Sequence, residues 1–201
     1  MKARVSEEGL PVPVVLASGS AERRRLLGEL LPAFEVREPQ VERKPGINGG
    51  SPESVAVRRA ERKARDVAQD RQDALILAAD TVVECEDEIL GKPEDLDDAR
   101  RMLRLLTSHP QRVITGVCLL TPARLRLDRV DAADIELREF SEAEIEDYVQ
   151  NSDVCRWAGA YALQPDDPNV TRLDGDEDTV QGLPLERVEE GLSTLYPGWS
   201  A

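Results

Sequence analysis

Two short apolar runs constrain the fold of this chain more than any other feature of its sequence. Residues 12–17 and 74–79 are apolar throughout, and the first run is followed by Ser18-Gly19-Ser20 and a leucine-spaced segment over 22–31. A short apolar run bounded by turn residues is typical of a buried strand, and leucines at helical spacing are typical of an amphipathic helix. The order strand, tight turn, helix therefore predicts a sheet covered by helices.

The rest of the chain continues this alternation. Further helices are predicted at 53–68, where Ser51 and Pro52 form a start signal, at about 96–106, from the capping box at 141–144 to Tyr148, and at 184–195. Further strands are predicted at 112–120 and 130–140, a hairpin turn at 84–88, and loops at 44–52 and 165–178. Strands that alternate with helices indicate an α/β or mixed α+β fold with a central sheet.

Charge limits the partners of such a fold. The 201 residues include 26 Lys and Arg against 40 Asp and Glu, which gives a formal net charge of -14. An acidic surface repels phosphodiester backbones, so a nucleic-acid polymer is not an expected partner. A small anionic ligand would need its own local group of basic residues. The length suits a single domain over 1–201, or two small lobes that share a core.

The sequence also indicates a compartment. No apolar run approaches the roughly 20 residues that cross a bilayer, and the first ten residues are too polar for a signal peptide. Cys85, Cys118 and Cys155 form neither a close pair nor a zinc-binding spacing. We therefore expect no membrane partner, and a cytoplasmic protein with reduced thiols.

The first candidate site lies between the first predicted strand and helix. Ser18 and Ser20 flank a glycine that allows close backbone approach, and a helix N-terminus offers unpaired N–H groups to a phosphate. Arg23, in the first turns of the helix, adds positive charge. An ordinary helix cap explains the same residues and is the more frequent case.

Three further segments carry candidate chemistry. Asp80 and Thr81 follow the buried run 74–79, at the end of the predicted strand, where a carboxylate can hold a divalent ion or deprotonate water, although a turn residue that ends the strand is the more frequent case. Lys92 stands in a tight loop, where it can meet a phosphate or simply face solvent. The small residues of 158–163 lead to the polar Gln164, and a crowded structural turn would explain them equally well.

The order of these segments resembles the Maf family over residues 14 to about 192, which we expect to be the core. The matching blocks are Leu16-Ala-Ser-Gly-Ser20, Arg59-Ala-Glu-Arg-Lys63-Ala-Arg65, Ala79-Asp80-Thr81-Val82-Val83, Leu90-Gly-Lys92-Pro93, Val113-Ile-Thr115-Gly116-Val117, Ala158-Gly159-Ala160-Tyr161 with Gln164, and Gly182-Leu183-Pro184-Leu185. The resemblance implies a two-lobed α/β fold around an elongated mixed sheet, similar to the inosine triphosphate pyrophosphatases. It also implies a cytoplasmic nucleoside triphosphate pyrophosphatase that requires a divalent cation such as Mg, Mn or Co. Members commonly form dimers, so a homodimer is compatible with it.

The resemblance assigns roles to residues of this chain. Asp80 matches the proton acceptor of the family, and Lys63 and Lys92 match its phosphate-facing lysines. Arg23 matches the second arginine of a Ser-Pro-Arg-Arg block that binds substrate together with Ser18 and Ser20. Glu42 matches a site carboxylate, which with Asp80 would hold the metal ion.

Three positions distinguish a dTTP/UTP branch from a 7-methyl-GTP branch, and here they are Glu22, Thr81 and Gln164. The last two resemble the dTTP/UTP branch, but Glu22 fits neither, and its charge opposes a polyphosphate unless a metal ion or Arg24 offsets it. Arg156-Trp157 and Pro165-Asp166-Asp167 also depart from the family pattern. These departures leave two alternatives open: a pyrophosphatase for 7-methyl-GTP or another non-standard nucleotide, and a catalytically weak nucleotide-binding regulator.

Overall fold

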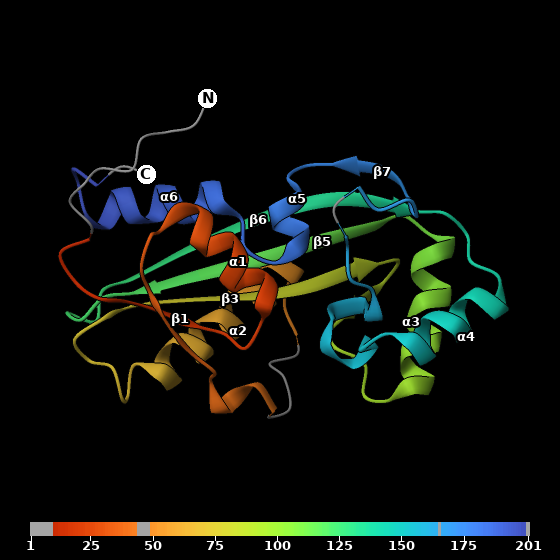
Figure 1. Ribbon diagram of the computed structural model, residues 1–201, viewed down its shortest axis with the longest axis horizontal. Coiled ribbons are helices and arrows are strands. Elements are labelled where there is room, and N and C mark those ends of the chain that lie inside the picture. Colours follow the sequence, from red (N-terminus) through yellow and green to blue (C-terminus); the bar gives the residue numbers. More distant parts are fainter. Residues whose placement is uncertain (1–9, 44–48, 165, 200–201) are drawn as a thin grey trace. The chain divides into compact units, whose positions relative to one another are not determined.

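The computed structural model describes residues 10–43, 49–164 and 166–199 (Figure 1). Over these residues, six α-helices and three short 3-10 helices accompany a sheet of seven strands. The predicted α/β class, with a mixed central sheet, is confirmed. None of the helices in the described ranges is both long and apolar enough to cross a bilayer.

The strands form one mixed sheet in the order β2-β1-β3-β5-β6-β7, with β4 paired to β3. Strand β1 runs parallel to β2 and β3, whereas the β3–β4 and β6–β7 pairs are antiparallel. The strands are β1 (Val14–Ala17), β2 (Glu35–Arg37), β3 (Leu75–Cys85), β4 (Glu88–Leu90), β5 (Gln111–Leu120), β6 (Arg126–Leu137) and β7 (Val170–Asp174).

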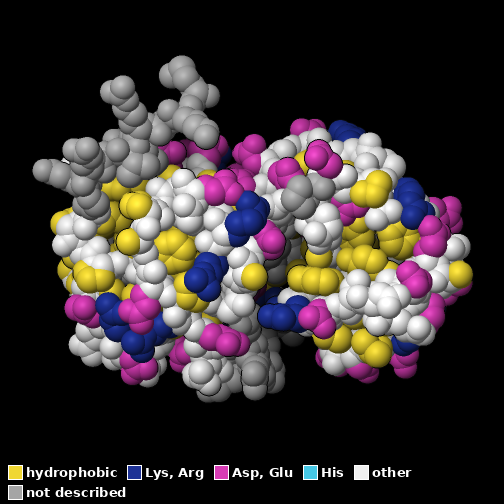
Figure 2. All heavy atoms as spheres, in the orientation of Figure 1, with side chains coloured by type: hydrophobic (Ala, Val, Ile, Leu, Met, Phe, Trp, Pro, Cys, Tyr) yellow, Lys and Arg dark blue, Asp and Glu magenta, His cyan; other side chains and the backbone are white. Residues whose placement is uncertain are grey.

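The chain divides into two compact units, and each is described separately. The first unit takes the described residues of 1–80, 115–131 and 182–201, and the second takes those of 81–114 and 132–181. On the face shown in Figure 2, basic and acidic side chains of the described residues are interspersed, with no continuous basic surface.

In the first unit, side-chain alternation along the strands builds two cores. Leu75 and Leu77 of β3 pack in one cluster with apolar residues of α1 (Ala21–Leu30) and α6 (Leu185–Leu195), while Ile76 and Ala78 pack with residues of α2 (Pro52–Val67). Because successive strand residues face opposite sides of a sheet, helices cover both faces of β3 here. This explains why the run 74–79 is continuously apolar.

Gly116 of β5 lets α2 approach the sheet closely. A Cβ at this position would lie 2.5 Å from the backbone nitrogen of Val57 and 2.6 Å from the carbonyl carbon of Ala56. Real side chains do not tolerate such contacts with backbone, so only glycine allows α2 to lie at this depth. The position of α2 matters because this helix carries Lys63.

The second unit packs α3 (Leu96–Ser108) against α4 (Glu142–Asn151) and the short 3-10 helices η2 (Val154–Arg156) and η3 (Ala158–Ala160). Its core joins β3, β5 and β6 residues to these elements, with Leu103 and Leu106 of α3 fully buried. The predicted capping box is present: Ser141 Oγ accepts from Glu144 N–H, and the Glu144 carboxylate accepts from Ser141 N–H. Arg100 and Arg104 of α3 form ion pairs with Glu146 and Glu142 of α4.

Most predicted elements are confirmed, including the hairpin between Val83 and Ile89. Strands β3 and β4 are paired there, with Val83 opposite Leu90 and Glu84 opposite Ile89. The prediction of a loop over 165–178 is wrong. Strand β7 lies within it and pairs with β6, and α5 (Glu177–Gln181) begins at its end. Strand β7 is mostly exposed, so its residues lack the apolar pattern of a buried strand while turn-forming residues surround it. The three-residue strand β2 lacks that pattern for the same reason, since two of its residues are exposed.

Candidate active site

The turn between β1 and α1 forms a helix cap, in which the hydroxyl oxygens of Ser18 and Ser20 each accept a backbone hydrogen bond. Ser20 is the N-cap residue of α1, and its Oγ accepts from Arg23 N–H at 3.3 Å. Ser18 is buried, and its Oγ accepts from Ser20 N–H at 3.1 Å. The ordinary helix cap considered from the sequence therefore accounts for the oxygen acceptors, while each hydroxyl keeps its own hydrogen as a donor.

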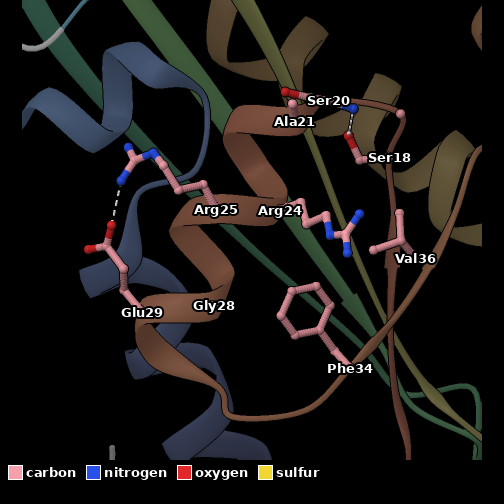
Figure 3. Close-up of a pocket in the computed structure, with 10 residues that line it drawn as sticks. Ser18, Ser20, Ala21, Arg24, Arg25, Gly28, Glu29, Phe34 and Val36 are labelled. Atoms are coloured by element: carbon pink, nitrogen blue, oxygen red, sulfur yellow. Dashed lines mark hydrogen bonds and ion pairs between the residues drawn. The ribbon is translucent and has the colours of Figure 1, made fainter.

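A shallow cavity of about 700 Å³ opens beside this turn, within the first unit (Figure 3). Its lining includes Ser18 and Ser20 together with Arg24, Phe34 and Val36. Figure 3 shows the Arg24 side chain on the same side of α1 as Phe34 and Val36, whereas Arg25 extends away toward Glu29. One guanidinium and one aromatic ring thus lie near the two predicted serines.

Arg23 has a fixed position inside the first unit. Its side chain is 9% exposed, and Nε donates to the carbonyl oxygen of Gly182 at 2.8 Å. That contact joins α1 to the segment that enters α6, which is one of the blocks resembling the Maf family. Buried arginines of this kind are paired or hydrogen-bonded, because an unmet buried charge is costly.

The most buried charged contact of the first unit joins Lys63 to Asp80. Lys63 Nζ lies 2.7 Å from Asp80 Oδ1 and donates to the carbonyl oxygen of Ala79 at 3.3 Å. The two side chains are 5% and 13% exposed. Helix α2, seated by Gly116, thus brings its lysine to Asp80. The prediction that Asp80 lies at the end of a strand is wrong, because β3 continues through Asp80 to Cys85.

Arg59 is a residue near Asp80 for which the sequence predicts no role. Its Nη1 lies 3.9 Å from Asp80 Oδ2, and its side chain is 19% exposed. A signal is present in the sequence, since Arg59 precedes Lys63 by four residues and therefore shares its helix face. Two cations of α2 thus approach the two oxygens of one carboxylate.

The remaining predicted residues of the first unit are Glu22 and Glu42. Glu22 is exposed in the first turn of α1 and pairs with Arg25 Nε at 2.9 Å, so a third group besides a metal ion and Arg24 can offset its charge. Arg25 is three residues further along α1 and shares its face, whereas Arg24 points into the cavity of Figure 3. Glu42 lies in the 3-10 helix Gln40–Arg43, but its side chain falls outside the described part of the structure.

Thr81, Lys92 and Gln164 belong to the second unit. Thr81 follows Asp80 on β3 and is half-buried, while Lys92 and Gln164 are exposed. The loop that carries Lys92 is tied to η3, since Gly159 N–H donates to the carbonyl oxygen of Gly91 at 2.9 Å. Two sequence blocks far apart in the chain therefore meet within this unit.

Gly159 lies in a crowded part of the segment 158–163. It has a φ of +69°, and a Cβ there would lie 2.7 Å from Cδ1 of Leu106. Left-handed backbone and close packing both require glycine at this point. The crowded structural turn considered from the sequence is therefore present, and Gln164 follows it.

The donor set for a metal ion is limited. Among the described residues, no group of three or more His, Cys, Asp or Glu side chains has metal-binding geometry. Asp80 offers one carboxylate. This suits an ion such as Mg²⁺ that takes one or two protein carboxylates and obtains its other ligands from water and substrate phosphates.

Comparison with known proteins places the chain in a family. The family model described as Maf-like protein matches residues 13–195. Proteins named dTTP/UTP pyrophosphatase are 41% identical over 190 residues in Salinibacter ruber, 40% over 176 residues in Anaeromyxobacter dehalogenans and 37% over 184 residues in Dictyoglomus thermophilum. These matches cover 93%, 86% and 90% of this chain and 93%, 88% and 95% of the respective relatives.

Among solved structures, the Ham1 protein of Staphylococcus aureus matches with a TM-score of 0.48 at 12% identity, covering 91% of this chain and 95% of that one, which is too distant to bear on activity. The sequence relatives and the family model extend over nearly the whole length of the chain and agree with one another. The chain belongs to the Maf family.

Proposed function

We propose that this protein is a nucleoside triphosphate pyrophosphatase that hydrolyses dTTP and UTP. Water attacks the α-phosphorus, and the bond between that phosphorus and the oxygen bridging to the β-phosphorus breaks. The products are the nucleoside monophosphate and pyrophosphate, which leaves with the electron pair of the broken bond. The names of relatives at 37–41% identity support this choice of substrates.

The observation that carries the proposal is the buried pair of Lys63 and Asp80. Lys63 fixes the carboxylate by engaging Oδ1, so that Asp80 is oriented before substrate arrives. In the proposed reaction Asp80 accepts the proton of the attacking water. A positioned carboxylate in this role typically contributes about 100- to 10,000-fold to the rate.

Phosphate binding is assigned to groups that supply positive charge or N–H and O–H donors. In the first unit these are Ser18 and Ser20, at the N-terminus of α1, and Arg23. Lys92 of the second unit is proposed as a further phosphate contact. A triphosphate carries about four negative charges, so a chain of net charge -14 needs such local groups to bind it.

We propose that a divalent cation, Mg²⁺, Mn²⁺ or Co²⁺, accompanies the substrate and is held by Asp80 and Glu42. When bound, it neutralises phosphate charge and stabilises the pyrophosphate leaving group. The net charge of -14 makes the requirement for a divalent cation stronger, because the acidic residues of the chain outnumber the basic ones. Removal of divalent ions with a chelator should therefore abolish turnover.

Base recognition is assigned to Thr81 and Gln164. The amide of Gln164 has one acceptor and two donors, so it can pair with the imide edge of uracil or thymine through both kinds of bond. Glu22 forms an ion pair with Arg25, and this reduces its repulsion of a phosphate.

We further propose a cytoplasmic location, where nucleoside triphosphates and reduced thiols occur together. A homodimer is the proposed assembly, and light scattering tests it.

The experiment is pyrophosphate release from a panel of nucleoside triphosphates with each metal ion. The wild-type protein should act faster on dTTP and UTP than on CTP or GTP. Asp80→Asn should lower turnover at least about 100-fold in a protein that still folds, with a lower unfolding midpoint because Lys63 loses its buried partner. Asp70→Asn, an exposed aspartate of the same unit, is the matched control and should behave as wild type.

Near-wild-type turnover by a folded Asp80→Asn protein removes Asp80 from the proposed role. If 7-methyl-GTP is the best substrate of the panel, the branch assignment is wrong while the reaction stands. If no triphosphate is hydrolysed but one raises the melting temperature, the protein is a nucleotide-binding regulator.

A further inference from the structure

The segment that carries Gln164 is held by one carboxylate. Asp167 Oδ2 accepts from the Tyr161 hydroxyl at 2.7 Å and from Gln164 N–H at 3.3 Å, and Oδ1 accepts from Asn169 N–H at 2.9 Å. Three donors from both sides of this turn therefore converge on a single side chain. All of these residues belong to the second unit.

Tyr161 and Asn169 are themselves firmly anchored. Tyr161 stacks on Tyr148 of α4 with ring centroids 5.4 Å apart and planes 16° from parallel, and burial raises the pKa of its hydroxyl. Asn169 Nδ2 donates to that hydroxyl, and Asn169 Oδ1 accepts from Arg138 Nε at 2.9 Å. Asp167 thus connects Gln164 to two points that cannot move without disturbing packed or paired groups.

The side chain of Gln164 also has a defined direction. Gln164 Nε2 donates to the carbonyl oxygen of Ala162 at 3.4 Å, and Ala162 N–H donates to the Tyr148 hydroxyl at 3.2 Å. With one N–H used in this way, the amide presents its oxygen and its second N–H to a ligand. The backbone is held by Asp167 and the amide by the segment that Tyr148 holds.

This direction matters because a glutamine amide can rotate. Uracil and thymine offer an N–H donor beside a carbonyl acceptor, whereas cytosine offers a ring-nitrogen acceptor beside an amino donor. An amide that is free to turn over satisfies either edge. Only an amide of fixed direction can accept one base and reject the other, since the wrong base then leaves polar groups unpaired.

We propose that Asp167 is a positioning residue that fixes Gln164 and thereby excludes cytosine nucleotides. The inference rests on the proposed function, because it assumes that Gln164 meets the base. It gives a role to Asp167, one residue of the departure from the family pattern noted in the sequence. Asp167 itself acts through Gln164 and needs no contact with substrate.

The test compares kcat/KM for UTP and CTP in four single variants and one double variant. Asp167→Asn keeps the shape but turns one acceptor into a donor that faces an N–H or O–H group. Tyr161→Phe keeps the stacked ring and removes only the hydroxyl. Asp166→Asn is the matched control, because it removes the same charge one residue away at an exposed position with a φ of +53° that asparagine tolerates. Gln164→Ala removes the proposed reader.

Asp167→Asn should lower the UTP-to-CTP ratio about tenfold, the scale of one lost hydrogen bond, mainly by improving KM for CTP. Tyr161→Phe should lower the ratio in the same direction, and Asp166→Asn should leave it unchanged. In the Gln164→Ala background, Asp167→Asn should have no further effect on the ratio.

If Asp167→Asn and Tyr161→Phe lower kcat/KM equally for UTP and CTP, Asp167 has only a structural role and the inference is overturned. The inference is also overturned if Asp167→Asn shifts the ratio as much without Gln164 as with it. If the wild-type protein releases pyrophosphate from no nucleotide, the proposed function fails first and the inference with it. An active wild-type protein that shows no preference for UTP over CTP contradicts the inference and the proposed base preference, while the pyrophosphatase reaction stands.

Discussion

Two ion pairs of this protein have the same length and different surroundings. Lys63 Nζ lies 2.7 Å from Asp80 in the first unit, and Arg104 Nη2 lies 2.7 Å from Glu142 in the second. The side chains of the first pair are 5% and 13% exposed, and those of the second are 49% and 70% exposed. Water screens the exposed pair, whereas the buried pair retains most of its electrostatic interaction.

Burial, more than distance, therefore distinguishes the Lys63–Asp80 pair from a surface pair. The α3–α4 pairs join two helices that already pack through an apolar core, so they add little. The Lys63–Asp80 pair lies at the middle of β3, next to its continuously buried half, where charged groups are costly to bury unless they are paired. Substitutions at the buried pair should accordingly have larger effects than substitutions at the exposed ones.

The largest effect is expected from Lys63→Met. Removal of the ammonium leaves the Asp80 carboxylate without its nearest partner, which should destabilise the fold by about 3 kcal/mol. Loss of a fixed carboxylate and of a phosphate contact should also lower kcat/KM at least about 100-fold. Urea unfolding and pyrophosphate release measure the two effects, with Arg65→Met, an exposed cation on the same helix, as control. If Lys63→Met and Arg65→Met have the same stability and the same kcat/KM, the buried pair contributes no more than a surface pair.

A smaller effect is expected from Gly116→Ala, which tests how α2 is seated. The new methyl group would overlap the backbone at Val57, so α2 must shift, at a cost of about 1–3 kcal/mol and with displacement of Lys63 from Asp80. Gly28→Ala is the matched control: nothing lies within 4 Å of a Cβ there, and alanine should stabilise α1 by roughly 0.5–1 kcal/mol. Thermal unfolding and turnover of both variants test this. A Gly116→Ala protein with wild-type activity would show that Lys63 does not depend on the depth of α2.

The smallest effect concerns the second unit and is a stabilisation that is lost in acid. The hydrogen bond from Arg100, aided by one from Gln150, lowers the pKa of Glu146 from 4.5 to about 2. A carboxylate whose pKa is lower in the folded state stabilises the fold above its unfolded pKa, and this contribution is lost as pH falls. The unfolding midpoint of Glu146→Gln should therefore fall less steeply than that of wild type between about pH 4.5 and pH 2, with unchanged activity at neutral pH. Parallel curves would mean that the pair makes no contribution even when ionised.

The sequence was sufficient for the elements whose residues carry a periodic pattern or a cap. Ser51 and Pro52 predict the start of α2, and Ser141 and Glu144 predict the start of α4. The run 74–79 predicts β3. Strands β2 and β7 could not be recognised in this way. Their pairing comes from neighbouring strands, and their own side chains are mostly exposed.

Some contacts of the candidate site could likewise be predicted from the sequence, and others could not. Resemblance to the Maf family named Lys63 and Asp80, and the structure brings them within 2.7 Å. The partner of Glu22 depended on which neighbouring arginine shares its helix face. The contacts of Asp167 could not be foreseen, because they arise from a turn whose residues depart from the family pattern and bond across it.

The most direct test of the proposed reaction is hydrolysis of UTP by the wild-type protein in oxygen-18-labelled water. If water attacks the α-phosphorus, the heavy oxygen appears in UMP and the pyrophosphate remains unlabelled. Label in pyrophosphate, or release of inorganic phosphate in place of pyrophosphate, would mean that another phosphorus is attacked and would contradict the account.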